Sequence, residues 1–84
     1  MEMTTEEILE GLTAILQEVA GTDPAEVELD KSFVNDLDVD SLLMVEVVVA
    51  AEERFGVSIS EDDLKDGSTV GDLVQSIQGV LAAV

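Results

Sequence analysis

The fold is decided by residues 41–56, which read SLLMVEVVVAAEERFG. At 100° per residue this stretch predicts a helix from about Ser41 or Leu42 to Phe55, and Gly56 suits the left-handed conformation that ends a helix. One side of the predicted helix gathers apolar side chains and is its natural core face. These residues are Met44, Val47, Val48, Ala51 and Phe55.

The opposite side of the same helix carries a second apolar stripe. It consists of Leu42, Val45 and Val49, and the carboxylates that share this side or lie at its edge are Glu46, Glu52 and Glu53. A helix that served only to pack a core would have no reason to expose an apolar stripe among charges. The second stripe therefore predicts a contact surface.

Another amphipathic helix precedes this one. Apolar residues recur at spacings of three and four over residues 4–19, with Thr4 and Glu7 placed as a capping box and Gly21 as the stop. Residues 22–40 show no sustained period, but they include apolar side chains that would pin them to the helices. We expect an ordered loop here, and its length invites a functional explanation.

Two further patterns follow the central helix. Residues 60–67 contain a capped acidic start and Leu64, which predict one or two helical turns. Thr69 caps a last helix with Asp72 at its third position, and an apolar stripe follows. The sequence therefore predicts an all-α fold, a small four-helix bundle of three main helices and one short helix, with a long ordered loop between the first two main helices.

Length and charge narrow the function. Eighty-four residues predict one domain, residues 1–84, with a modest core and no room for a large enclosed active site. Twenty acidic residues against three basic ones give a formal charge of −17, which repels nucleic-acid phosphates and anionic lipid surfaces. The chain has neither Cys nor His, so catalysis by a thiolate or a histidine base is excluded. We expect a binding or carrier module and no enzyme.

The apolar stretches are too short for a membrane span. The longest, residues 42–51, is interrupted by Glu46, and the start of the sequence lacks a basic signal-peptide head. A cytoplasmic monomer is the expectation.

The acids before the central helix have some of the spacing of metal ligands. Asp36, Asp38 and Asp40 are spaced like the first three ligands of an EF-hand calcium loop, but Ser41 stands where the loop needs Gly and Val47 where it needs Glu. No dedicated metal site is expected, and a calcium-binding interaction module is kept only as a further alternative. A paired-carboxylate hydrolase would need a cleft and a buried carboxyl, and the sequence suggests neither.

Ser41 admits two interpretations. A serine at the start of a helix commonly caps its first turn through the hydroxyl oxygen. A serine at the end of a long loop is also expected to be exposed, and the N-terminus of a helix favours a phosphate group attached there. The second interpretation makes Ser41 a site of attachment.

These features together resemble the acyl carrier proteins, specifically the discrete carriers of bacterial dissociated type II fatty-acid synthases. The resemblance rests on DLDVDSL at residues 36–42 and VEVVVAAEERF at residues 45–55, and it extends to TVGD at residues 69–72. It implies that Ser41 receives 4′-phosphopantetheine from coenzyme A through a separate Mg²⁺-dependent phosphopantetheinyl transferase. The terminal thiol of that arm then holds growing fatty-acyl chains as thioesters, and in the family the acyl chain can fold back between the helices.

The resemblance and the charge pattern imply the same partner surface. A carrier that is handed between many enzymes suits long-range steering by charge and a small contact area. The expected partner-binding residues are Asp36, Asp40, Leu42, Val45, Glu46, Val49, Glu52 and Glu53. Besides the transferase, the implied partners are the acyltransferase, ketosynthase, ketoreductase, dehydratase and enoyl reductase of fatty-acid synthesis.

Two residues depart from the usual family pattern. Leu43 stands where relatives often carry a polar or acidic residue, and Arg54 interrupts the acidic run, so partner preferences are expected to differ. A carrier of a dissociated polyketide synthase has the same fold and cofactor and remains the alternative, although the context of residues 36–42 favours fatty acids. A peptidyl carrier fits less well, because Val39 and Asp40 precede the serine in place of the usual glycine pair.

Overall fold

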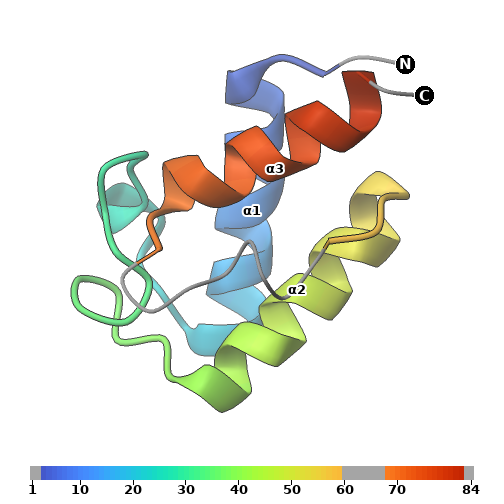
Figure 1. The fold of residues 1–84 in the computed structure, drawn as a ribbon. Helices are drawn as coiled ribbons and strands as arrows, with labels where there is room; N and C mark the ends of the chain where they lie inside the picture. The colour runs from blue at the N-terminus through green and yellow to red at the C-terminus, as the bar shows by residue number, and fades with distance from the viewer. Residues whose placement is uncertain (1–2, 60–67, 83–84) are drawn as a thin grey trace.

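The computed structural model describes residues 3–59 and 68–82 of the chain. Within these ranges the fold consists of the α-helices α1 (Thr5–Ala20), α2 (Ser41–Phe55) and α3 (Val70–Ala82), with the 3₁₀-helix η1 (Pro24–Glu26) between the first two. Figure 1 shows α1 in the centre, crossed by α3 near one end and by α2 near the other. The all-helical prediction is confirmed, and the short helix expected at residues 60–67 lies outside the described residues.

The ends of α1 and α3 follow the predicted signals. The Glu7 N–H donates to Thr4 Oγ1 at 3.2 Å, and the Thr4 N–H donates to Glu7 Oε1 at 3.1 Å, which completes the capping box of α1. Gly21 ends that helix with φ 67°, a left-handed conformation that glycine adopts without steric cost. Thr69 and Asp72 make the same pair of reciprocal bonds, at 3.2 Å and 3.0 Å, at the start of α3.

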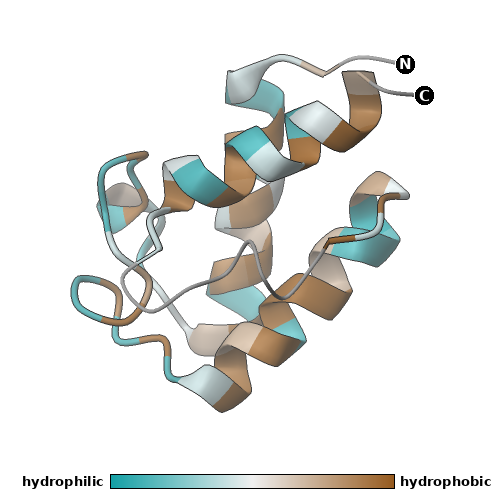
Figure 2. Ribbon diagram, in the orientation of Figure 1, coloured by the Kyte–Doolittle hydropathy of each residue, from teal (hydrophilic) through white to brown (hydrophobic). Residues whose placement is uncertain are grey.

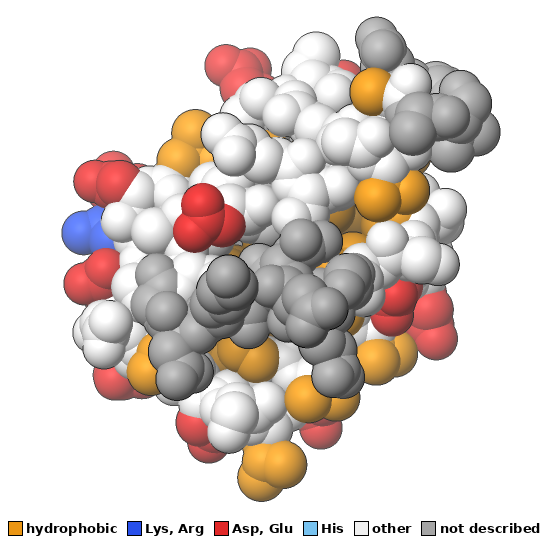
Figure 3. All heavy atoms as spheres, viewed as in Figure 1, with side chains coloured by type: hydrophobic (Ala, Val, Ile, Leu, Met, Phe, Trp, Pro, Cys, Tyr) orange, Lys and Arg blue, Asp and Glu red, His pale blue; other side chains and the backbone are white. Residues whose placement is uncertain are grey.

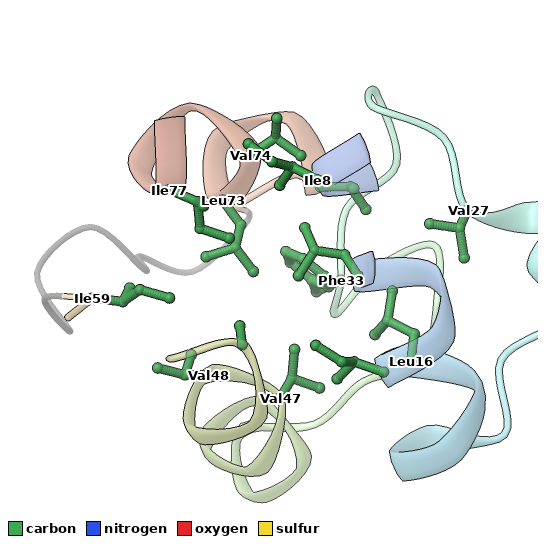
Figure 4. Close-up of a cluster of buried hydrophobic side chains, with 14 of the residues drawn as sticks. Ile8, Leu16, Val27, Phe33, Val47, Val48, Ile59, Leu73, Val74 and Ile77 are labelled. Carbon is green, nitrogen blue, oxygen red and sulfur yellow. The ribbon is translucent and has the colours of Figure 1, made fainter. Parts of the chain in front are cut away.

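All three α-helices and the segment before α2 contribute to one hydrophobic core (Figure 4). From α2 this core receives Val47, Val48 and Ala51, whereas Met44 and Phe55, which were predicted on the same face, are only half-buried. Phe55 lies against Gly11 of α1, where a Cβ atom would stand 2.5 Å from Cζ of the ring. The missing side chain of Gly11 therefore gives the Phe55 ring its place between the two helices.

The segment between α1 and α2 is tied to the core and to the start of α3. Its buried residues are Thr22, Val27, Ser32, Phe33, Leu37 and Val39. Its backbone accepts two hydrogen bonds from the start of α3. The Gly71 N–H donates to the Leu29 carbonyl at 2.8 Å, and the Val70 N–H donates to the Lys31 carbonyl at 2.9 Å. An isolated antiparallel bridge joins residues 32 and 69, and no β-strand occurs elsewhere in the described part of the chain. These bonds hold the approach to α2 against α3.

None of the helices that the structure describes combines the length and the apolar character needed to cross a bilayer. Hydrophobic residues nevertheless extend over much of α2 (Figure 2), including parts that do not face the core. The helix therefore carries more apolar surface than its packing uses.

Candidate functional site

The N-terminus of α2 is capped by Asp40 and not by Ser41. Asp40 has an extended backbone, and its Oδ1 accepts the Leu43 N–H at 2.9 Å. Ser41 is therefore the first residue of the helix, and its interpretation as the cap is wrong. Its side chain is exposed, and no hydrogen bond among residues 3–59 and 68–82 involves its hydroxyl. The cap does not use this hydroxyl.

A hydrogen-bonded turn precedes Asp40 and fixes the place where α2 begins. The Ser32 N–H donates to Asp36 Oδ2 at 2.7 Å, and the Asp36 N–H returns a bond to the Ser32 carbonyl at 2.9 Å. The Leu37 N–H shares that carbonyl at 3.1 Å, and the Asn35 N–H donates to Ser32 Oγ at 3.2 Å. Asp36, which was predicted to bind partners, thus has a local structural role that its sequence position did not reveal.

Asp38 gives this turn its left-handed step. Its φ is 55°, and among the described residues no other residue besides glycine has a positive φ. This left-handed conformation costs about 1 kcal/mol, and Asp tolerates it better than most residues. Asp38 is exposed between buried Leu37 and Val39, and the Val39 N–H donates to the Phe33 carbonyl at 2.8 Å. Burial on both sides holds the turn in place, so Ser41 emerges from a fixed point.

The second apolar stripe of α2 lies on the surface, as predicted. Leu42, Val45 and Val49 are 80%, 56% and 47% exposed, although each is a large apolar side chain. Figure 3 shows hydrophobic and acidic side chains interspersed along the edge of the molecule that α2 forms. Leu42 is adjacent to Ser41 in the chain, so the stripe begins beside the free hydroxyl.

The five acids predicted to meet partners fall into two groups. Three of them accept a hydrogen bond from the backbone: Asp36, Asp40 and Glu52. The other two, Glu46 and Glu53, are exposed and make no hydrogen bond within the part of the chain that the structure describes. The first group stabilises the fold around the site, whereas the second consists of exposed charges.

The described residues include no group of three or more acidic side chains placed to hold a metal ion. In the turn before α2 the carboxylates of Asp36 and Asp40 accept separate backbone bonds and do not converge. Ser41 differs from both, because its exposed hydroxyl makes no hydrogen bond within the described ranges.

The setting of Ser41 fits a phosphate ester. Its hydroxyl is exposed at the first turn of α2, where unpaired backbone N–H groups and the positive end of the helix dipole favour negative charge. With no His or Cys in the chain, there is no side chain of the usual kind to activate the serine as a catalytic nucleophile. An exposed serine hydroxyl at the N-terminus of a helix suits a covalently attached phosphate group.

Comparison with known proteins gives the family. Residues 10–77 match the family described as "Phosphopantetheine attachment site". The chain is 58% identical over 77 residues to the acyl carrier protein of Acidothermus cellulolyticus, which covers 92% of each protein. It is 54% identical over 78 residues to the acyl carrier protein of Thermobifida fusca, covering 93% of this chain and 99% of the relative. The meromycolate extension acyl carrier protein of Mycolicibacterium smegmatis is 53% identical over 78 residues, covering 93% of this chain and 79% of that protein.

The chain therefore belongs to the acyl carrier protein family. The phosphopantetheine-binding domain of this family carries covalently attached 4′-phosphopantetheine, and its members are carriers and not catalysts.

Proposed function

We propose that this protein carries growing fatty-acyl chains as thioesters on a 4′-phosphopantetheine arm attached to Ser41. The observation that supports Ser41 as the point of attachment is the cap at Asp40, which leaves the neighbouring hydroxyl exposed and without a hydrogen bond in the described part of the chain. When bound, the arm supplies the thiol that this cysteine-free chain lacks. Residues 1–84 act as one carrier domain in this proposal.

The residues of this chain contribute position and charge. Ser41 Oγ forms the bond to phosphorus while the pyrophosphate bond of coenzyme A breaks and adenosine 3′,5′-bisphosphate leaves. The first turn of α2 favours the negative charge of the resulting phosphodiester. We expect the serine proton to pass to a base of the phosphopantetheinyl transferase, because this chain has no His or Cys and the adjacent Asp40 carboxylate already accepts the Leu43 N–H. Asp40 keeps the hydroxyl available by capping the helix in its place.

The surface of α2 next to Ser41 is the proposed docking face. Leu42, Val45 and Val49 offer a small exposed apolar contact, and Glu46 and Glu53 offer exposed charges to basic patches of partner enzymes. Steering by charge with little buried area suits partners that must bind and leave quickly. A formal charge of −17 also disfavours self-association, so we propose a monomer.

The proposed cargo is a fatty-acyl chain and not a polyketide. The proposal rests on the resemblance of residues 36–42 to carriers of fatty-acid synthesis. It is also consistent with the name of one relative, the meromycolate extension acyl carrier protein of Mycolicibacterium smegmatis. The enzymes expected to act on this carrier are those that load, extend, reduce and dehydrate the chain.

Analysis of the protein from its own host tests both parts of the proposal. The purified protein is digested with a glutamate-specific protease, and fragmentation by mass spectrometry locates the arm and its acyl group. The expected result is an arm on Ser41 with saturated or 3-oxo acyl chains. Polyketide intermediates would contradict the cargo, and an arm on another serine, such as Ser58 or Ser76, would contradict the site.

A further inference from the structure

Glu52 organises the backbone that leaves α2. Its carbonyl accepts the N–H groups of Gly56 and Val57, the latter at 3.2 Å. Its side chain reaches further, because Oε2 accepts the Ile59 N–H at 2.8 Å from seven residues away. A hydrogen bond to an ionised acceptor is about twice as strong as one between neutral groups. The carboxylate of Glu52 therefore holds a segment that helix geometry alone would not hold.

This segment covers one side of the core. Val57 and Ile59 are 7% and 8% exposed, whereas Ser58 between them is exposed. Figure 4 shows the Ile59 side chain entering the hydrophobic cluster beside Val48 of α2 and Ile77 of α3. The main helix packing of both α2 and α3 is against α1, and within the described ranges α2 and α3 have no comparable contact with each other. Among the described residues, Ile59 thus contributes to the core between them.

We propose that residues 57–59 form a strap over the core between α2 and α3, and that Glu52 is the positioning residue that holds this strap closed. The neighbouring acid differs from Glu52, because Glu53 is exposed and makes no hydrogen bond in the described ranges. Two adjacent residues of equal charge therefore have different roles. Glu53 supplies charge to the surface, whereas Glu52 joins the surface of α2 to the core.

The position of Glu52 links the strap to the docking of partners. It lies at the edge of the proposed docking face, and a basic side chain of a partner that paired with its carboxylate would weaken the bond from the Ile59 N–H. Docking would then loosen Ile59 and open the core between α2 and α3. This use rests on the proposed function, whereas the hold of Glu52 on the strap does not.

Amide hydrogen exchange of the unmodified, ¹⁵N-labelled protein tests the strap by NMR. In Glu52→Ala the Ile59 amide loses its acceptor, so its protection should fall at least about tenfold, while amides of α1 such as Leu12 stay protected. Glu52→Gln keeps a neutral acceptor and should restore part of the protection. Glu53→Ala is the matched control and should leave Ile59 unchanged.

The alternatives give different results. If Ile59 stays protected in Glu52→Ala, or if Leu12 loses protection to the same extent as Ile59, Glu52 does not hold a separate strap and the proposal is wrong. The proposal is also wrong if Glu53→Ala loosens Ile59 as much as Glu52→Ala does. None of these results would affect attachment at Ser41, so the two proposals fail independently.

Discussion

The N-termini of α1 and α2 are capped by different chemistry. In α1 the hydroxyl of Thr4 accepts the Glu7 N–H at 3.2 Å and is thereby occupied. In α2 the carboxylate of Asp40 accepts the Leu43 N–H at 2.9 Å, and the hydroxyl of Ser41 stays exposed. The start of α3 follows α1, with Thr69 as the acceptor.

The difference shows when a hydroxyl at a helix start is available for chemistry. Both ends meet the same demand, since the first backbone N–H groups of a helix have no partner within it. Where a threonine meets that demand, its oxygen is committed to structure. Where an aspartate meets it one residue earlier, the hydroxyl of the following serine remains exposed and available. We therefore expect removal of the caps to cost stability and removal of the serine to cost only function.

Loss of the cap of α2 should have the largest effect on stability. Asp40→Ala removes the acceptor for Leu43 and a negative charge at the positive end of the helix, so the free energy of unfolding should fall by about 1.5 kcal/mol. Urea unfolding followed by circular dichroism measures the change. Asp40→Asn keeps an oxygen acceptor and should lose less than about half of that amount. Equal losses in both variants would mean that the charge of Asp40 matters and its oxygen acceptor does not, and no loss in Asp40→Ala would mean that the cap is unimportant.

Loss of the cap of α1 should be slightly milder. Thr4→Ala breaks one of the two capping-box bonds and should lower the free energy of unfolding by about 1 kcal/mol in the same urea experiment. Thr4→Ser is the control and should stay close to the wild type. A Thr4→Ala variant that is as stable as the wild type would show that the first N–H groups of α1 do not need the Thr4 hydroxyl as their acceptor.

The hydroxyl of Thr22 adds a third case to the comparison, because it is buried and has no hydrogen-bond partner in the described ranges. The Ser41 hydroxyl has no hydrogen-bond partner within these ranges either, but Ser41 is exposed whereas Thr22 is buried. Burial of a hydroxyl without a partner is unfavourable, so Thr22→Val should raise the free energy of unfolding by about 1 kcal/mol. The backbone bond from the Thr22 N–H to the Leu16 carbonyl is retained in this variant. Destabilisation on urea unfolding would show that the hydroxyl has a partner after all.

The smallest stability effect is expected at Ser41 itself. Ser41→Ala removes a hydroxyl that makes no hydrogen bond in the described ranges, and alanine suits a helix slightly better than serine. The free energy of unfolding should change by less than about 0.5 kcal/mol. A loss as large as that of Thr4→Ala would mean that Ser41 contributes to the cap.

The helix ends could be predicted wherever a local rule decides them. A threonine followed three residues later by an acid marks the starts at Thr4 and Thr69, and glycine marks the stop at Gly21. The two apolar sides of α2 also follow from a fixed angle per residue. The choice between Asp40 and Ser41 could not be predicted, because both are good caps and only the backbone conformation distinguishes them.

Contacts outside helical spacing were also beyond the sequence pattern. The bond between Glu52 and Ile59 joins residues seven apart, and the pairing of Ser32 with Asp36 depends on a turn without a recognised period. The half-burial of Phe55 depends on a glycine in another helix. Each of these features arises from tertiary geometry and not from local propensity.

Intact-mass measurement of the arm tests attachment at Ser41 most directly. Wild type, Thr4→Ala and Ser41→Ala are each incubated with coenzyme A, Mg²⁺ and a phosphopantetheinyl transferase. Wild type and Thr4→Ala should each gain the mass of one phosphopantetheine group, whereas Ser41→Ala should gain none although it remains folded. A wild type that gains no such mass, or a Ser41→Ala variant that gains it equally, would contradict attachment at this serine.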